Sequence, residues 1–395
     1  MRRTDAKKSF LILTLAAVLA SCTTTSAVKP DRRSHQREKS GNTIQLLFGG
    51  DIMAHSENYN ISAFEKIWQD VRELIAGADL AFANLEAPVD TSRPASFYPN
   101  FNMTEDYVKA AVDAGFDVFS LCNNHTNDQG LGGIRSTTDV MKQISAEAGN
   151  NGRRIWFAGL KDGINAPYTH SIIEANGWRI LFLPVTELLN RQDYSAYINF
   201  VRTDAASRRE FTDYLARLRQ ENPCDIFVLS LHTSEAEYIR GVTKSQDNFY
   251  EQILDAGVDI LWANHAHIIK NRKIIVSDNG TDKIIMYACG NTISGQRRNP
   301  ALFAEVPNGE RDNTGDGLLY KVLLRKSADG SIRVERTEAH IITTYINEAG
   351  EFILKPLNQE FVDELYALGR GDWAKYLERR IKINENETKD LTEWR

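Results

Sequence analysis

Cysteine is scarce in this sequence. Four cysteines occur in 395 residues, and one of them, Cys22, stands apart near the N-terminus. The other three, Cys122, Cys224 and Cys289, form an odd set without short spacings. Such a set excludes a disulfide framework of the kind that holds small secreted domains together. Each of the three flanks an apolar, strand-like run, which predicts buried thiols.

Long apolar segments are also lacking. Residues 10–20 form an apolar run of eleven residues that is interrupted only by Thr14. The run is too short for a stable membrane span, which takes about 20 residues, but it has the length of a signal-peptide core. It follows a basic start, with four Lys and Arg residues among the first eight. No later segment is long and apolar enough to cross a bilayer.

The apolar run ends in Leu19-Ala20-Ser21-Cys22, which resembles the bacterial lipobox. We expect residues 1–21 to be a lipoprotein signal peptide and Cys22 to be lipidated, so that the exported protein is lipid-anchored at the cell membrane or the outer membrane. The alternative is an ordinary cleaved signal peptide with an incidental cysteine. Residues 22–42 are polar and charged, with almost no large apolar side chains, which predicts a flexible tether.

Positive charge is in the minority. The chain has 47 Lys and Arg against 53 Asp and Glu, a formal net charge of -6. An acidic protein is poorly suited to bind phosphate backbones, so we expect no nucleic-acid partner. The balance says little about a small or polymeric substrate, because a metal centre can invert the local field.

Helices and strands alternate from Thr43 onward, which predicts an α/β layered domain over residues 43–345, with an antiparallel portion toward its end. A charged helical extension is expected over residues 346–395. The expected strands lie at 44–48, 80–83, 118–121, 155–158, 171–174, 179–184, 226–231, 258–262, 274–276, 284–288, 318–324 and 332–343. The expected helices lie at 64–75, 104–114, 134–148, 205–221, 246–256 and 361–383.

Five of the apolar strands are followed at once by side chains that can bind a metal ion. In chain order these side chains are Asp51; Asn84 and Glu86; Asn123, Asn124 and His125; His232; and Asn264, His265 and His267. Ligands gather at the carboxyl ends of the strands in α/β sheets, so we expect the five ends to meet in one crevice. Only eight histidines occur in the chain, and four of them lie at these ends. This ligand set suits divalent Zn, Mn or Fe.

Each of these residues also has a purely structural interpretation. Asp51 after two glycines could form a turn or cap a helix, and His232 alone could be a hydrogen-bonded core histidine. His265 and His267 carry a stronger signal, because two residues spaced by two in extended backbone place both rings on one side. Taken singly, most of the residues favour the structural interpretation, whereas five ordered strand ends together favour a metal site.

The same residues carry a family resemblance. Gly49-Gly50-Asp51-Ile52-Met53, the segment Asp79 to Glu86, the stretch from Asn123 to Gly130, His265-Ala266-His267 and Gly290-Asn291 resemble, in order, the motifs of the CapA family of capsule and poly-gamma-glutamate synthesis proteins. The resemblance covers about 43–343. This family is related to calcineurin-like metallophosphoesterases, so the resemblance implies a four-layer α/β/β/α sandwich.

The resemblance also implies a site that holds one or two divalent ions. Glu86 would bridge two ions; Asp51 and His267 would hold one of them, and Asn124, His232 and His265 the other. His125 would act as general acid beside the metals, and Asn84, Asp128 and Asn291 are candidates for contacting substrate. Two of these positions depart from ordinary metallophosphoesterases: Met53 replaces a histidine, with His55 two residues further on, and Glu86 replaces an aspartate.

The implied function is synthesis, transport or anchoring of a capsular polymer or poly-gamma-glutamate at the cell envelope, with a hydrolase-type metal site. Expected partners are the polymer or a small-molecule substrate, the membrane through the lipid anchor, and membrane proteins of capsule synthesis. Two alternatives stay open: a non-catalytic polymer-binding or assembly lipoprotein, and a metal-dependent phosphoesterase acting on nucleotides or phosphorylated sugars. Phe97, Tyr98 and Phe101 either line the crevice or pack their own loop.

Overall fold

The computed structural model describes residues 41–278 and 280–395. The predicted signal peptide, the lipidation site Cys22 and nearly all of the predicted tether lie outside the described residues. The described residues belong to one compact unit. Among the described residues, no helix has the length and apolar character that a membrane span needs.

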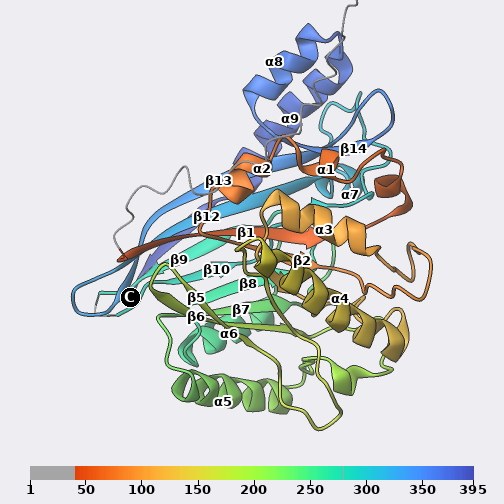
Figure 1. The fold of residues 1–395 in the computed structure, drawn as a ribbon. Helices are drawn as coiled ribbons and strands as arrows, with labels where there is room; N and C mark the ends of the chain where they lie inside the picture. The colour runs from red at the N-terminus through yellow and green to blue at the C-terminus, as the bar shows by residue number, and fades with distance from the viewer. Residues whose placement is uncertain (1–40, 279) are drawn as a thin grey trace, which may run out of the picture. The chain divides into compact units, whose positions relative to one another are not determined.

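Two β-sheets form the centre of this unit (Figure 1). The first sheet has the strand order β14-β13-β12-β1-β2-β3-β4, with β11 added beside β1. Its strands are β1 (Thr43–Ile52), β2 (Leu80–Leu85), β3 (Val118–Ser120), β4 (Trp156–Ala158), β11 (Asn291–Ile293), β12 (Asp316–Lys326), β13 (Ile332–Ile346) and β14 (Phe352–Pro356). Strands β1 to β4 run parallel, whereas β12 to β14 are antiparallel.

The second sheet has the order β15-β9-β10-β8-β7-β6-β5. Its strands are β5 (Ser171–Ala175), β6 (Trp178–Thr186), β7 (Ile226–His232), β8 (Ile260–Asn264), β9 (Arg272–Val276), β10 (Lys283–Met286) and β15 (Asp390–Trp394). Strands β6, β7 and β8 are parallel. The loops at their carboxyl ends therefore lie together, as do those of β1, β2 and β3.

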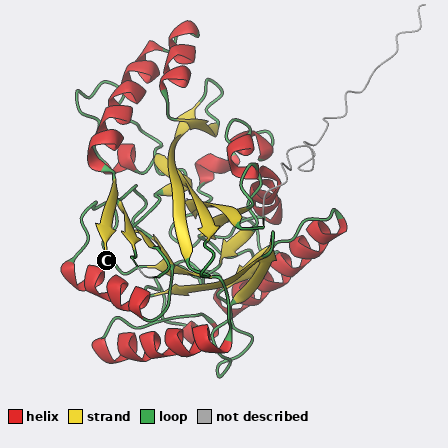
Figure 2. Cartoon of the chain, turned by 90° about the vertical axis from the view of Figure 1, so that its left-hand side faces the viewer, coloured by secondary structure: helices red, strands yellow, loops and turns green. Residues whose placement is uncertain are grey.

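Helices cover the outer faces of both sheets (Figures 1 and 2). The first sheet carries α1 (Glu65–Trp68), α2 (Arg72–Ala76), α3 (Glu105–Ala114) and α4 (Gly130–Asn150), and the second carries α5 (Ala205–Glu221) and α6 (Lys244–Asp255). Between the sheets lies an apolar layer that includes Phe48, Phe82 and Trp262, all fully buried. Alternating side chains of each inner strand face this layer and the helices in turn. The predicted four-layer α/β/β/α sandwich is confirmed.

Two predicted helices are each broken in two. The segment 64–75 forms α1 and α2, which are separated by three residues, the last of them the buried Val71 (φ -113°, ψ -4°). The segment 361–383 forms α8 (Gln359–Ala367) and α9 (Gly371–Glu387), because Gly369 adopts a positive φ of 73° that ends α8.

Three strands were not predicted. Strand β11 is only three residues long, and β14 and β15 lie in the segment that was expected to be helical. Strand β14 pairs with β13, and β15 pairs with β9 along Asp390–Trp394. Residues 346–395 thus extend both sheets in addition to forming α8, α9 and their own apolar cluster with β13. A short, mostly exposed edge strand such as β15 carries too little apolar alternation for sequence periodicity to reveal it.

Candidate metal centre

The two sheets bring the predicted ligands into one buried cluster. Asp51 ends β1, Glu86 follows β2, Asn124 follows β3, His232 ends β7, and His265 and His267 follow β8. All of these side chains are at most 3% exposed. We call this set of six residues the histidine cluster: Asp51, Glu86, Asn124, His232, His265 and His267.

The glycine pair before Asp51 allows β1 to approach the β11 segment closely. A Cβ on Gly50 would lie 1.8 Å from the carbonyl oxygen of Gly290. The Gly50 amide donates to Thr292 Oγ1 (2.7 Å), and the Asp51 amide donates to Gly290 O (3.0 Å). Glycine is therefore required at position 50 so that the backbone can place Asp51 beside the second sheet.

We expect Gly50→Ala to lower the free energy of unfolding by about 3 kcal/mol or more, because the added methyl group collides with backbone that cannot move aside. Chemical denaturation measures this loss. Gly149→Ala in α4 is the matched control, since a Cβ there meets nothing within 4 Å and the change should be neutral or slightly stabilising. Equal stabilities of the two variants would contradict the packing role of Gly50.

His232 joins the sheets across the cluster. Its Nε2 lies 2.8 Å from Asn124 Oδ1 and 3.2 Å from His265 Nδ1, and its Nδ1 lies 3.4 Å from Asn84 Nδ2. Asn84 in turn donates to Asp51 Oδ1 at 2.8 Å. The structure thus places Asn84, a candidate substrate contact, between Asp51 and His232, where its amide orients both.

The backbone of His265 and His267 differs from the prediction. Both residues lie beyond the end of β8 and have positive φ angles, 98° and 55°, so the expected extended conformation is wrong. Their rings nevertheless stay together, with centroids 5.8 Å apart. Positive φ is costly for residues with a side chain and persists where the surrounding structure enforces it, which is a frequent property of functional sites.

Asn291 and Asp51 together set the tautomer of His267, because an oxygen of each lies within hydrogen-bond distance of Nδ1. The Asn291 amide nitrogen faces three oxygens: Thr314 O at 2.9 Å, Ser294 Oγ at 3.0 Å and Gln296 Oε1 at 2.8 Å. A backbone carbonyl only accepts, so the amide oxygen of Asn291 must be the atom that faces His267 Nδ1, 3.0 Å away. His267 therefore carries its proton on Nδ1, which leaves the Nε2 lone pair directed toward Glu86 (3.7 Å). Asn291, another candidate substrate contact, thus orients His267.

Glu86 occupies the middle of the cluster. Its two carboxylate oxygens are buried without a hydrogen-bond partner, and it belongs to both groups of side chains whose ligand atoms lie within 4.8 Å of one another. These groups are Glu86, His265 and His267, and Asp51, Glu86 and His232. Burial, reinforced by the neighbouring Asp51, raises the pKa of Glu86 well above its ordinary value. Unpartnered buried carboxylate oxygens amid histidines fit a divalent cation.

Two histidines are held in their neutral, metal-binding form. Burial, with His265 and His267 nearby, lowers the pKa of His232 well below its ordinary value, and burial lowers the pKa of His265 to about 4. For His267, burial is more than offset by the Asp51 carboxylate, 3.2 Å from Nδ1, and its pKa is raised. Within the described part of the chain, no Lys or Arg hydrogen-bonds to or pairs with the cluster, so its carboxylates lack a cationic side chain.

His125 lies beside the cluster and belongs to neither cation group. Its Nδ1 is 2.7 Å from Asp128 Oδ2, and Asn190 Nδ2 lies 3.3 Å from the same nitrogen. The Phe101 ring packs edge-on at 4.7 Å, and its amide donates to Asp128 Oδ2 (2.8 Å). Asp128 thus orients His125. Of the aromatic loop residues, Phe101 is buried against His125, whereas Tyr98 is 74% exposed.

The structure places Met53 and His55, the two unusual residues of the first motif, outside the histidine cluster. Met53 is buried in the apolar cluster under the helices of the first sheet. His55 stands apart from both cation groups: its Nδ1 accepts a hydrogen bond from the Gly295 amide, and its ring packs against Phe101 at 5.0 Å. His55 therefore does not replace the missing histidine ligand.

Sequence reasoning missed three residues at the site. Asn190 contacts both Asn124 and His125 from the loop after β6. Glu237 has a half-buried carboxylate 3.8 Å from His265 Nε2. Tyr238, with a positive φ of 62°, has its ring centroid 6.0 Å from that of His267. Their loops carry no periodic pattern that would reveal them in the sequence.

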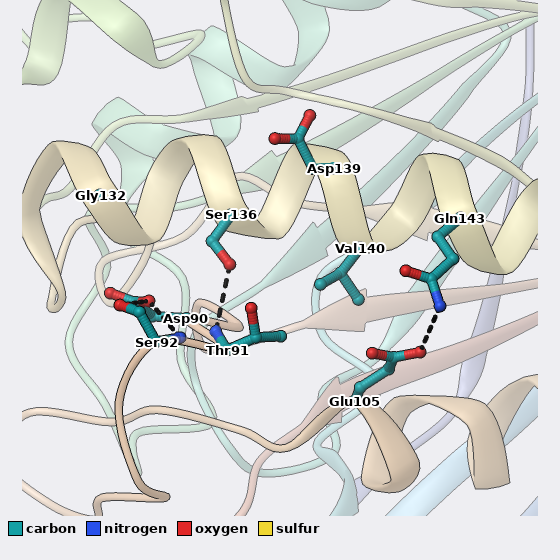
Figure 3. Close-up of a pocket in the computed structure, with 9 residues that line it drawn as sticks. All are labelled: Asp90, Thr91, Ser92, Glu105, Gly132, Ser136, Asp139, Val140 and Gln143. Atoms are coloured by element: carbon teal, nitrogen blue, oxygen red, sulfur yellow. Dashed lines mark hydrogen bonds between the residues drawn. The ribbon is translucent and has the colours of Figure 1, made fainter.

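A separate surface groove runs between α4 and the segment around Asp90, and Figure 3 shows its lining. Ser136 accepts a hydrogen bond from the Thr91 amide (3.1 Å), and Gln143 donates to Glu105 (3.1 Å). The groove contains none of the predicted site residues, and these polar groups bond to one another.

The family model for the bacterial capsule synthesis protein PGA_cap matches residues 45–296, which include every residue of the histidine cluster. The chain belongs to this family. It is 26% identical over 307 residues to the capsule biosynthesis protein CapA of Bacillus anthracis, covering 72% of this chain and 68% of the relative. It is 23% identical over 310 residues to the PGA biosynthesis protein CapA of Bacillus subtilis strain 168, covering 77% and 74%.

Two solved structures are distantly similar to this PGA_cap family member. A hypothetical protein from Thermus thermophilus has 16% identity and a TM-score of 0.41, covering 75% of this chain and 98% of that one. The calcineurin-like phosphoesterase YfkN from Bacillus subtilis has 11% identity and a TM-score of 0.40, covering 85% and 99%.

Proposed function

We propose that this PGA_cap family member is a metal-dependent hydrolase of the cell envelope that acts in the synthesis or export of a capsular polymer. One observation carries the proposal: a buried set of three histidines, Asp51 and a partnerless Glu86 lies beside a histidine–aspartate pair. Purely structural histidines would satisfy Glu86 with hydrogen bonds. The capsule role is supported by the family and by the two CapA relatives, whose names record capsule and PGA biosynthesis.

The residues divide into holders and a proton donor. Glu86, shared by both cation groups, is the bridging candidate, with Asp51, Asn124 and the three cluster histidines around it. Bound divalent ions would supply Lewis acidity and an activated water. Manganese, zinc and iron all suit this mixture of nitrogen and oxygen ligands.

His125 is placed to protonate a leaving group. The contact of Nδ1 with Asp128 fixes the ring, so that Nε2, which lies 3.4 Å from Asn190 Nδ2, is the nitrogen that would carry the transferable proton. Phe101 packs against the ring and Asn190 borders it, so that the imidazole is held in one orientation. This division of labour resembles other acid–base pairs in which a carboxylate orients a histidine.

The proposed location is the cell membrane or the outer membrane, where a lipid on Cys22 would anchor the exported chain. The support is the basic start, the short apolar run and the Leu19-Ala20-Ser21-Cys22 sequence. Membrane proteins of capsule synthesis are proposed partners, and the acidic charge of the chain speaks against a nucleic acid.

Substrate assays test the reaction. The full chain, supplied with manganese or zinc, should cleave either poly-gamma-glutamate and gamma-glutamyl amides or phosphate esters, and chelation should abolish the activity. Cleavage of the amides alone supports the polymer-directed function, whereas cleavage of phosphate esters alone favours the phosphoesterase alternative. A chain that is loaded with metal and binds the polymer, but cleaves neither class of substrate, contradicts the hydrolase proposal and favours an assembly protein.

A further inference from the structure

Helix α9 contacts the loop that supports the histidine cluster. Two polar residues on its inner face, Arg380 and Asn384, are fully buried. Arg380 Nε and Asn384 Nδ2 both donate to Asp316 Oδ2 at 2.8 Å. Asp316 is the first residue of β12, so a single carboxylate oxygen ties the C-terminal helix to the first sheet.

The other oxygen of Asp316 binds a second buried arginine. Arg297 donates to Asp316 Oδ1 at 2.6 Å and also to the backbone oxygen of Asp312. Its guanidinium packs closely against the turn 312–316. A Cβ on Gly315 would come within 1.8 Å of Arg297 Nε, so only glycine fits at this position. Burial alone would raise the pKa of Asp316, but Arg297 and Arg380 lower it to about 2. The turn is therefore clamped between two charged anchors.

The clamped turn in turn positions Asn291. Thr314 O, within the turn, is one of the acceptors that fix the Asn291 amide, and a Cβ on Gly317 would lie 2.0 Å from Asn291 O. The Asn291 oxygen then accepts from His267 Nδ1 at 3.0 Å, beside the Asp51 carboxylate at 3.2 Å, and helps to hold the proton on Nδ1. A continuous path of contacts thus leads from α9 to a ligand of the candidate metal centre. We name Arg380, Asn384, Asp316, Arg297 and Asn291 the Asp316 network.

The network is more than is needed to attach α9. Helices α8 and α9 have an apolar cluster with β13, in which Tyr345, Trp373 and Leu377 are buried. Buried charges cost desolvation energy, and apolar side chains of similar size would often serve stability equally well. The Asp316 network also lies mostly outside the part matched by the family model, residues 45–296, which includes only Asn291 of its members.

We propose that the Asp316 network is a positioning device, through which the C-terminal helix holds Asn291 and so keeps His267 Nε2 free to bind a divalent ion. The proposal rests on the proposed function for its metal, but the tautomer of His267 can be observed without one. Partners that orient ligating histidines typically change metal affinity by about 10- to 100-fold when they are removed.

Two variants and one control test the network in the full chain. Arg380→Met leaves a neutral Asp316–Arg297 pair, and Asn384→Ala removes one donor while both arginines remain. Leu377→Ala is the control, since it removes a buried apolar side chain of the same helix that belongs to the apolar cluster with β13 and not to the Asp316 network. The readouts, taken on folded protein, are manganese affinity by calorimetry and the His267 tautomer by nitrogen-15 NMR of the metal-free chain at alkaline pH.

We expect both network variants to lose the single Nδ1-protonated form of His267 and to bind manganese about 10-fold more weakly, with Leu377→Ala unchanged in both respects although less stable. An unchanged tautomer in both network variants, or an equal change in Leu377→Ala, overturns the proposal. If the wild-type chain binds no metal, the proposed function fails, and the tautomer alone then decides on the network.

Discussion

His125→Ala should lower turnover by about 10²- to 10⁴-fold and leave the metal content of the chain unchanged. Transfer of a proton to the leaving group by a positioned side chain typically contributes a factor of this size. The metal content should be preserved because His125 belongs to neither group of clustered ligands. Steady-state kinetics on the substrate found in the assays, together with elemental analysis of the same sample, measures both quantities.

Asp128→Asn is the companion variant. The amide keeps the size of the carboxylate that lies 2.7 Å from His125 Nδ1 but no longer stabilises a protonated imidazole. Turnover should fall less than in His125→Ala, with substrate affinity nearly unchanged. Loss of metal in His125→Ala would make His125 a ligand, and full activity in that variant would remove it from the mechanism.

Glu86→Gln should be more stable than the wild type without metal and less stable than the wild type with metal. In the metal-free chain, the pKa of Glu86 is raised above its ordinary value of 4.5 by burial and by Asp51. Above pH 4.5 the carboxyl group of Glu86 ionises freely in the unfolded chain but not in the folded chain, where its pKa is raised. The free energy of unfolding therefore falls as the pH rises above 4.5. Glutamine carries no such penalty, so the metal-free variant should be more stable than the wild type at neutral pH, with the difference vanishing in acid.

Added metal should favour the wild type instead. A cation at about one hundred times its dissociation constant stabilises a folded protein by about 2.7 kcal/mol. Glu86→Gln removes the ligand shared by both groups, so its melting temperature should barely respond to manganese or zinc. Thermal unfolding with and without metal, at neutral and acidic pH, measures the crossover. Parallel responses of the two proteins to metal would remove Glu86 from the centre.

The strand ends were predictable because their signal is local. Each apolar run and the polar residue after it are adjacent in the chain, and the rule that parallel strands gather ligands at their carboxyl ends brought Asp51, Glu86 and His232 together. The layered sandwich followed from the alternation of elements and from the family resemblance. Both depend on patterns within short windows or on a known order of motifs.

What could not be predicted depends on contacts between distant segments. Asn190 meets His125 across 65 residues, and β15 pairs with β9 from a distant part of the chain. The positive φ angles of His265 and His267 are imposed by the surroundings of β8, and no residue type there indicates them. Near Val71 and Gly369 the apolar periodicity of the sequence continues, although the helix is interrupted there.

The supporting residues were the least visible in the sequence. Asn291 was predicted to contact substrate, yet three acceptors turn its amide so that its oxygen faces His267. Asp128 was placed in the same class but orients His125. A short polar side chain after a strand has the same sequence signature whether it holds a substrate or a ligand. The acceptors around it decide between the two, and they lie elsewhere in the chain.

Elemental analysis of the full chain, beside the variant His265→Ala/His267→Ala, tests the central claim most directly. We predict that the wild type contains a divalent transition metal in at least equimolar amount after purification or reconstitution, and that the double variant contains almost none. A wild-type chain that stays empty when manganese, zinc and iron are supplied would contradict the metal centre and leave the histidine cluster without its proposed chemistry.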